Sequence, residues 1–177
     1  MYELIQVGEK SYYVNCPAKI GIYQQTETEV YLIDSGNDKD AGKKVRRILE
    51  EKGWKLKGIM NTHSHADHVG GNAYLQQQTG CKVFAGGIEA AFTKDPILEP
   101  TSLYAGYPCK DLRHKFLMAA GSKTVDFSDE DFPKEVEVIP LEELDFTKKL
   151  LSIDGEYYLD TFDKGAYYQV ITFDSEK

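Results

Sequence analysis

Ile59-Met60-Asn61-Thr62-His63-Ser64-His65-Ala66-Asp67-His68-Val69-Gly70-Gly71 is the stretch that decides the fold. Three of the four histidines in the chain fall within six consecutive residues of it, together with an aspartate. Folding does not require this density, whereas imidazole nitrogens and carboxylate oxygens are ligands of zinc and also suit iron or manganese. The stretch therefore predicts a metal site rather than a polar loop that happens to contain histidines.

The spacing of the histidines indicates how they converge. Residues 58–60 form a short apolar run typical of a buried strand, and the histidines begin where this strand is expected to end. Because residues two apart in an extended chain point the same way, His63 and His65 are expected to converge on one ion. Asp67 and His68 precede a glycine pair, where we expect a helix to begin, and should approach from a second direction.

This motif, His-x-His-x-Asp-His after a strand, resembles the signature of the metallo-β-lactamase superfamily. The upstream run Tyr31–Gly36 is similar to the strand of that family that ends in a buried aspartate. The resemblance is strong over residues 1–140, and residues 141–177 diverge from it. It implies an α/β fold of the αββα sandwich type, either complete or incomplete in its second half, forming a single domain over residues 1–177.

The same resemblance implies a one- or two-zinc site, with hydrolysis by metal-bound water or hydroxide. His63, His65, Asp67 and His68 match the motif as metal ligands. Asp160 resembles the family's metal-bridging aspartate, with a strand-end aspartate before a turn as the alternative. Asp67 is also the candidate catalytic residue, because with a single ion its carboxylate could accept the proton from water.

Two histidine positions of the family have no counterpart in this chain. A glutamate-rich run replaces the expected glycine–histidine loop, and the chain ends without a further histidine. Three explanations remain open. Glu142, Glu143 or Asp174 supplies oxygen ligands instead; the site holds one metal more weakly; or the chain is a degenerate, shortened or engineered version with a damaged site.

Asp34 has two interpretations. It is either an acceptor behind the ligands that fixes the metal loop or a turn residue before Ser35-Gly36-Asn37. The histidines downstream favour the first.

The composition disfavours several classes of protein, namely membrane-spanning, disulfide-rich secreted and nucleic-acid-binding proteins. The chain has 177 residues, 41% hydrophobic and 28% charged, as in an ordinary globular domain. It lacks a membrane-length apolar run and the layout of a signal peptide, and its three cysteines are odd in number and widely spaced, so we expect no disulfide framework and a cytoplasmic location. A formal net charge of −8 disfavours nucleic acid as a partner.

The pattern around the motif predicts the remaining elements. We expect strands at Tyr2–Val7, Ser11–Val14, Ile20–Gln24, Glu29–Ile33, Lys82–Ala85, Glu135–Pro140 and Tyr167–Phe173. We expect helices from Asp38 or Asp40 to about Lys52, and at Asn72–Thr79, Ile88–Phe92 and Asp111–Met118. Residues 93–108 are predicted to form an ordered loop, and residues 121–133 a solvated connection.

In the loop over residues 93–108, Leu103, Tyr104 and Tyr107 either line the substrate side of the site or cover the core. Short strands in the tyrosine-rich tail predict exposed sheet edges and hence pairing between chains, as in a homodimer.

Two functions follow. The first is a metal-dependent hydrolase acting on a small-molecule substrate with an ester, thioester, lactam or phosphodiester bond. The alternative, motivated by the missing histidines, is a catalytically impaired or non-catalytic domain of the same fold that acts as a binding or metal-holding module. A structural protein with no metal would leave the two matched motifs as coincidence.

Overall fold

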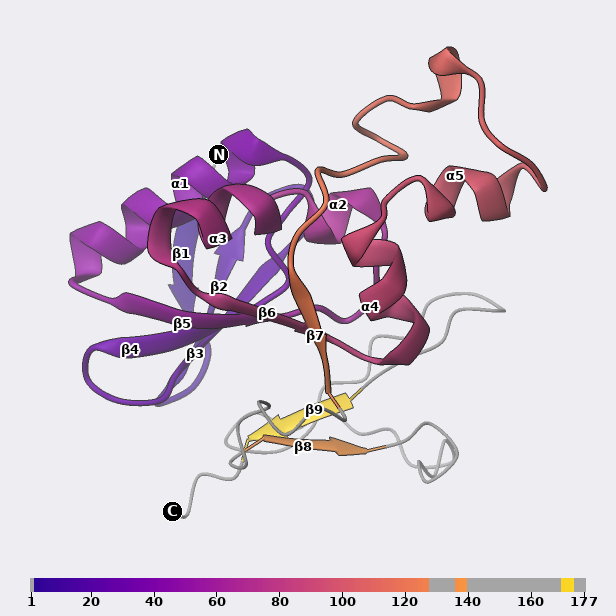
Figure 1. Cartoon of the computed structure of the whole chain (residues 1–177). Helices are drawn as coiled ribbons and strands as arrows, with labels where there is room; N and C mark the ends of the chain where they lie inside the picture. The colour runs from indigo at the N-terminus through magenta and orange to yellow at the C-terminus, as the bar shows by residue number, and fades with distance from the viewer. Residues whose placement is uncertain (1, 128–135, 140–169, 174–177) are drawn as a thin grey trace.

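The computed structural model describes residues 2–127, 136–139 and 170–173, and most of them build one seven-stranded sheet flanked by helices (Figure 1). The strands follow one another across the sheet in chain order: β1 (Glu3–Gln6), β2 (Ser11–Asn15), β3 (Ile20–Gln24), β4 (Glu29–Ile33), β5 (Lys55–Met60), β6 (Lys82–Ala85) and β7 (Thr124–Asp126). The pairs from β1 to β4 are antiparallel, whereas β4 to β7 pair in parallel. The mixed α/β class is thus confirmed.

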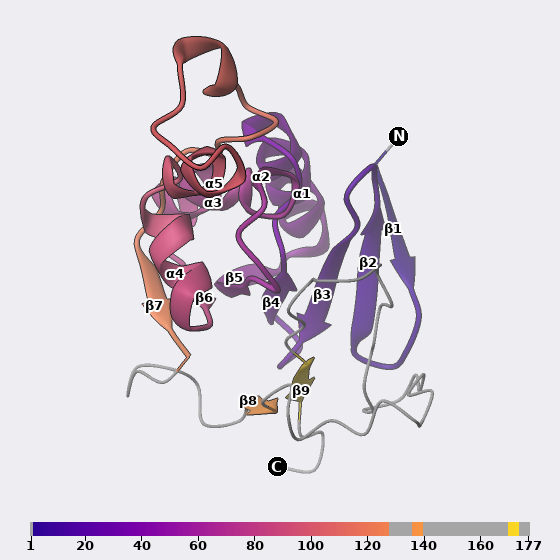
Figure 2. The ribbon, with the colours of Figure 1, turned by 90° about the vertical axis from the view of Figure 1, so that its right-hand side faces the viewer.

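Helices α1 (Lys39–Lys52) and α3 (Asn72–Thr79) pack together over one face of this sheet (Figures 1 and 2). Asp38 caps α1 by accepting hydrogen bonds from two backbone N–H groups of its first turn. Gly53 ends α1 in the left-handed conformation, at φ 71°. The main core lies between these helices and the sheet, and it consists of Val14, Cys16, Ile20, Ile22, Val30, Leu32, Val45, Leu49, Leu56, Ile59, Leu75, Cys81 and Val83.

The opposite face of the sheet carries a second, smaller apolar cluster. Tyr31, Met60 and Phe84 are buried there, with Val125 and Phe127 packed against them. Strands β8 (Val136–Ile139) and β9 (Val170–Phe173) pair antiparallel in a separate sheet that lies on this side (Figures 1 and 2). Helices, large sheet and small sheet thus follow the layer order expected of the first part of an αββα sandwich.

Three expectations for the middle of the chain are wrong. Residues 93–108 are not loop throughout, because α4 (Gly87–Lys94) runs into them and α5 (Leu98–Leu103) follows. Pro100 is tolerated because it lies in the first turn of α5, where no intrahelical donor is lost. The helix expected over residues 111–118 is reduced to the 3₁₀ turn η1 (Lys110–Leu112).

The remaining error concerns one strand. Residues 121–133 are not only a connection, because β7 forms within them by pairing with β6, a long-range contact that local pattern does not reveal. The helix expected to begin at the glycine pair is confirmed, because α3 starts at Asn72. Asp67 and His68, which precede it, lie in a short helix of their own, α2 (Ala66–Val69). The two expected late strands are confirmed within narrower bounds, as β8 and β9.

Substitution at Gly70 tests how closely the loop that carries His63, His65 and His68, here called the histidine loop, packs against the segment after β4. A Cβ at this residue would lie 2.4 Å from the carbonyl carbon of Asn37 and 2.5 Å from the backbone nitrogen of Asp38. We expect Gly70→Ala to lower the free energy of unfolding in urea by about 1–3 kcal/mol, because backbone must move to make room.

The matched control is Gly106→Ala, where an added Cβ meets nothing within 4 Å. Its unfolding midpoint should equal that of the wild type. Equal midpoints for both variants would show that Gly70 is not closely packed.

Candidate metal centre

The histidine loop leaves the sheet where two parallel strands end together. Ile33, the last residue of β4, pairs with Met60, the last residue of β5. The next residue of β4's chain, Asp34, donates its backbone N–H to the Met60 carbonyl at 2.9 Å. Parallel pairing thus brings Asp34 beside Asn61 and Thr62, although 27 residues separate Asp34 from Asn61 in the chain.

The Asp34 carboxylate is the centre of a hydrogen-bond network under the loop. Its Oδ1 accepts the backbone N–H of Thr62 at 2.9 Å. Its Oδ2 accepts the Thr62 hydroxyl at 2.7 Å and lies 2.8 Å from Nδ1 of His68. Asp34 is only 4% exposed. Asp34 is therefore an acceptor that holds the loop, and its role behind the ligands of a metal stays a prediction.

The network also determines which ring nitrogens carry hydrogen. A carboxylate only accepts hydrogen bonds, so Nδ1 of His68 is the donor to Asp34. The Thr62 hydroxyl has a single hydrogen, which it gives to Asp34, and it must therefore accept from Nδ1 of His63 across 2.9 Å. Both rings then carry hydrogen on Nδ1, and in the neutral form of each ring Nε2 keeps its lone pair for a cation.

The three imidazoles gather as the motif predicts. The ring centroid of His63 lies 4.6 Å from that of His65 and 4.0 Å from that of His68. Burial lowers the pKa of His63, and the neighbouring His68 lowers it further, which keeps the ring neutral. Burial also opposes the charge on His68, but the hydrogen bond and charge of Asp34 outweigh it and raise the pKa of His68.

Acidic side chains border the loop on its other sides. Asp67, on α2, is 61% exposed at its side chain, and its Oδ2 lies 3.6 Å from Nε2 of His68. Glu89 on α4 accepts the backbone N–H of Ser64 at 2.7 Å. Glu99 on α5 is 8% exposed. Burial, followed by the charge of Asp67, raises the pKa of Glu99 to about 7.

The backbone around the loop is held by Ser35. Its N–H and its hydroxyl both donate to the carbonyl of His68, at 2.8 and 3.2 Å, and the same hydroxyl accepts the N–H of Gly71 at 3.1 Å. Both glycines of the pair after the loop are needed for this fit, because a Cβ at Gly71 would lie 2.4 Å from the Ser35 carbonyl oxygen. Sequence reasoning did not identify Ser35, Glu89 or Glu99 as site residues, because no local pattern links them to the loop.

The described residues offer ligands for a divalent cation on one side of the ion only. The loop supplies three imidazoles, two of which are tied at Nδ1 by Thr62 and Asp34, and one exposed carboxylate. This is the chemistry that zinc, iron or manganese binds. Within residues 2–127, 136–139 and 170–173, however, no group of three His, Cys, Asp or Glu side chains is arranged to enclose an ion. The other predicted or alternative ligands lie outside the described residues: Glu142, Glu143, Asp160 and Asp174.

The large apolar side chains at and after the end of α5 do not cover the core. Leu103, Tyr104 and Tyr107 are 58%, 52% and 73% exposed. The guanidinium of Arg113 lies 4.6 Å from the ring centre of Tyr107. The core-covering alternative is therefore wrong, and a position on the substrate side of the site stays a prediction.

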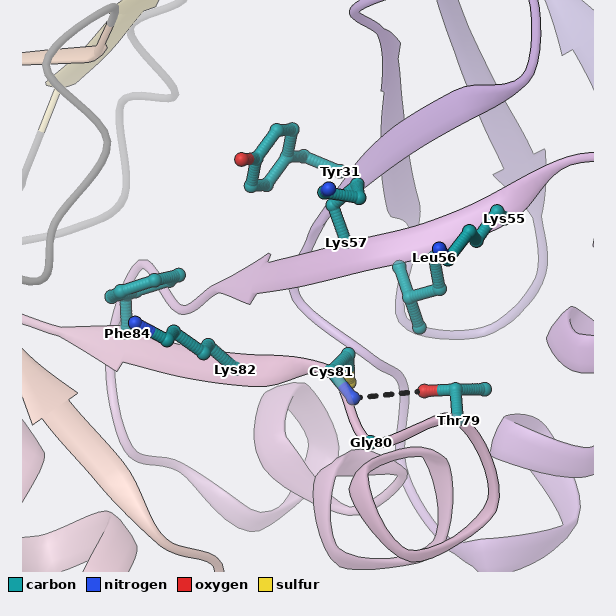
Figure 3. Close-up of a pocket in the computed structure, with 9 residues that line it drawn as sticks. All are labelled: Tyr31, Lys55, Leu56, Lys57, Thr79, Gly80, Cys81, Lys82 and Phe84. Carbon is teal, nitrogen blue, oxygen red and sulfur yellow. Dashed lines mark hydrogen bonds between the residues drawn. The ribbon is translucent and has the colours of Figure 1, made fainter.

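A pocket elsewhere on the sheet is not part of this centre. Figure 3 shows this cavity of about 370 Å³, lined by Tyr31, Lys55, Leu56, Lys57, Thr79, Gly80, Cys81, Lys82 and Phe84. It lies where β5 and β6 begin, whereas the histidines follow the end of β5.

Comparison with known proteins agrees with the geometry. The family model described as the metallo-beta-lactamase superfamily matches residues 15–151. Hydroxyacylglutathione hydrolase of Methylococcus capsulatus is 51% identical over 39 residues, which are 22% of this chain and 15% of that enzyme. The enzyme of the same name from Bradyrhizobium sp. is 54% identical over 44 residues, covering 25% and 17% of the two chains.

Solved structures share the fold. The subclass B3 metallo-beta-lactamase BJP-1 of Bradyrhizobium japonicum superposes with a TM-score of 0.57 at 21% identity, covering 78% of this chain and 48% of that one. The subclass B3 enzyme MEM-A1 from a soil metagenome library gives a TM-score of 0.55 at 24% identity, covering 80% and 49%. The chain thus spans about half the length of the structures it matches.

Two further observations concern the helices and the cysteines. None of the helices in the described part of the chain is long and apolar enough to cross a membrane. Cys16, Cys81 and Cys109 are all free.

Asp34→Asn tests the network under the loop. Asparagine tolerates the positive φ of 62° at this position, but its amide group cannot accept from both Thr62 and His68 as the carboxylate does. We expect zinc or cobalt affinity, measured by competition with a chromogenic chelator, to fall about 10–100-fold. Asp40→Asn, on the exposed start of α1, should bind as the wild type does. Equal affinity of both variants would contradict the role given to Asp34.

Glu99 predicts a pH dependence of stability in the metal-free protein. Its pKa is about 7 in the folded state against an ordinary 4.5, so the folded state holds more protons than the unfolded state between these values. Stability from this group is present at the acidic end and is lost as pH rises through the window. The urea midpoint of the wild type should therefore fall relative to that of Glu99→Gln between about pH 5 and about pH 7.5. Parallel pH profiles of the urea midpoint for the wild type and Glu99→Gln would refute the prediction. The control is Glu51→Gln, at an exposed position on α1.

Proposed function

Since the chain belongs to the metallo-beta-lactamase superfamily, we propose that it is a metal-dependent hydrolase whose histidine loop holds a divalent cation. The observation that carries the proposal is the pair of rings, His63 and His68, whose Nδ1 atoms are tied to Thr62 and Asp34. Two side chains oriented in this way from behind, with Nε2 left free, are what a cation site requires.

The ligands proposed are His63, His65, Asp67 and His68 from the loop and Asp160 from beyond the described residues. One or two zinc ions are the proposed cofactor, with iron or manganese as alternatives. When bound, such an ion lowers the pKa of water to about 7 and polarises the bond to be cleaved.

The chain's own residues have separate tasks. His63, kept neutral by burial, offers a lone pair rather than a charge. Asp34 holds the ring of His68 by accepting from its Nδ1. With a single ion in the loop, the exposed carboxylate of Asp67 is the group that accepts a proton from water.

A thioester is the substrate class that we favour among ester, thioester, lactam and phosphodiester. The curated relatives are named hydroxyacylglutathione hydrolases and are about half identical over their short matches. The β-lactamases share the fold at lower identity, which supports no particular substrate. We propose a small-molecule thioester as substrate, a cytoplasmic location and a single domain over residues 1–177, and pairing between chains stays a prediction.

A non-catalytic domain of the same fold remains the second candidate. It is favoured by the absence, within the described residues, of three side chains arranged to enclose an ion. A catalytic zinc normally keeps three protein ligands and one open position. Metal content and turnover measured together separate the two candidates.

His65→Ala tests the hydrolase directly. We expect the purified chain to contain stoichiometric zinc or iron and to hydrolyse a hydroxyacylglutathione thioester, and we expect His65→Ala to lose at least about 100-fold in kcat/KM, since a metal ligand is removed. His114→Ala, an exposed histidine outside the loop, is the control and should keep full activity. Equal rates for His65→Ala and the wild type would reject the assignment, and a folded chain that takes up no metal would favour the non-catalytic domain.

A further inference from the structure

The backbone between the clustered histidines has an unusual set of partners. Residues 63–65 belong to neither helix nor strand, so regular structure provides no partners for their N–H groups. Ser64 is 7% exposed and Ala66 is 1% exposed. A buried backbone N–H without a partner is costly, and the chain must therefore supply acceptors at these two residues from elsewhere.

Carboxylates from the two following helices supply them. Glu89, in the first turn of α4, accepts the Ser64 N–H at 2.7 Å through Oε2. Glu99, in the first turn of α5, accepts the N–H of Ala66. Ala66 is the first residue of α2, a helix whose N-cap, His65, makes no side-chain capping bond. Glu99 thus satisfies one of the N–H groups of the first turn of α2 that have no partner within the helix.

The two contacts alternate with the histidines along the chain. Ser64 lies between His63 and His65, and Ala66 follows His65. The Ser64 N–H belongs to the peptide that follows His63, and the Ala66 N–H to the peptide that follows His65, so the two contacts fix the peptide after each of these histidines. The ring of His65 lies edge-on to that of His63, with 4.6 Å between the centroids. Asp34 and Thr62 hold His63 and His68 but do not reach His65.

The hydrogen bonds are the only described interactions that tie these two carboxyl groups to other side chains or backbone by direct contact. Neither Glu89 nor Glu99 forms an ion pair with any residue that the structure describes. A carboxyl oxygen and an amide oxygen both accept a backbone N–H, so the contact and not the charge is what the loop requires.

We propose that Glu89 and Glu99 are positioning residues of the cation site: they hold the backbone on both sides of His65 so that its ring stays beside that of His63. The proposal rests on the proposed function, since it assumes that the loop holds a cation. It adds α4 and α5 to the parts of the chain on which cation affinity depends.

The test compares alanine and glutamine variants at both positions in the full chain. We expect Glu89→Ala and Glu99→Ala to weaken cobalt binding, measured by competition with a chromogenic chelator, by about 10–100-fold each. Glu89→Gln and Glu99→Gln should keep most of the affinity, because an amide oxygen still accepts the N–H. Glu51→Ala, an exposed glutamate on α1, is the control. Alanine variants that are folded and bind as tightly as the wild type would overturn the proposal, and so would glutamine variants as weak as the alanine ones.

A second measurement uses the unmodified protein without metal. Hydrogen exchange at the Ser64 and Ala66 amides should be slow, and it should speed up at Ser64 only in Glu89→Ala and at Ala66 only in Glu99→Ala. Fast exchange of both amides in the wild type would overturn the proposal even if an alanine variant fails to fold. A wild-type chain that binds no cobalt would reject the proposed function, and the exchange pattern would then decide the positioning separately.

Discussion

The buried carboxylate of Asp34 is the interaction on which the geometry of the candidate centre depends. It receives hydrogen bonds from the backbone and hydroxyl of Thr62 and from the ring of His68. A carboxylate has enough lone pairs for all of these at once, and an apolar or neutral side chain of the same size does not. The cost of burying its charge is offset only while these donors are present. The loop and the strand end therefore stabilise each other.

The second constraint is the close approach of the two chain segments that follow β4 and β5. Ser35 binds the backbone of His68 and Gly71, and the glycine pair allows contact distances at which no Cβ fits. On the other side, Glu89 and Glu99 accept N–H groups of the same loop. A loop held on both sides loses little further conformational entropy when it binds a ligand, which favours affinity.

Sequence reasoning predicted the parts of this structure that local pattern encodes. The strands from β1 to β6, α1 with its cap and its terminal glycine, and α3 closed by Gly80 follow from hydrophobic periodicity and from residues with special backbone preferences. The motif also predicted that three imidazoles gather, and Asp34 was identified because a strand-end aspartate before the motif had a known counterpart in the resembled family.

The errors and omissions arise where contacts between residues far apart in the chain determine the local structure. β7 exists because β6 offers it a partner. Helix α5 contains a proline that sequence analysis treated as a loop signal, although the first turn of a helix tolerates it. Some of these omissions are contacts to backbone groups far along the chain. The contact of Glu89 spans 25 residues and that of Ser35 with Gly71 spans 36. No short-range pattern in the sequence predicts such contacts. Asp160 belongs to residues that the structure does not describe, and so do Glu142, Glu143 and Asp174, which could replace the missing histidines.

The most direct test of the network is the tautomeric state of the histidines in the metal-free protein. Long-range proton–nitrogen NMR spectra, recorded at a pH where the rings are neutral, distinguish hydrogen on Nδ1 from hydrogen on Nε2. If Asp34 and Thr62 orient the rings before any cation binds, His63 and His68 will both carry hydrogen on Nδ1. Hydrogen on Nε2 instead of Nδ1 in either ring, or rapid averaging between the two tautomers, would contradict the role given to Asp34 and Thr62.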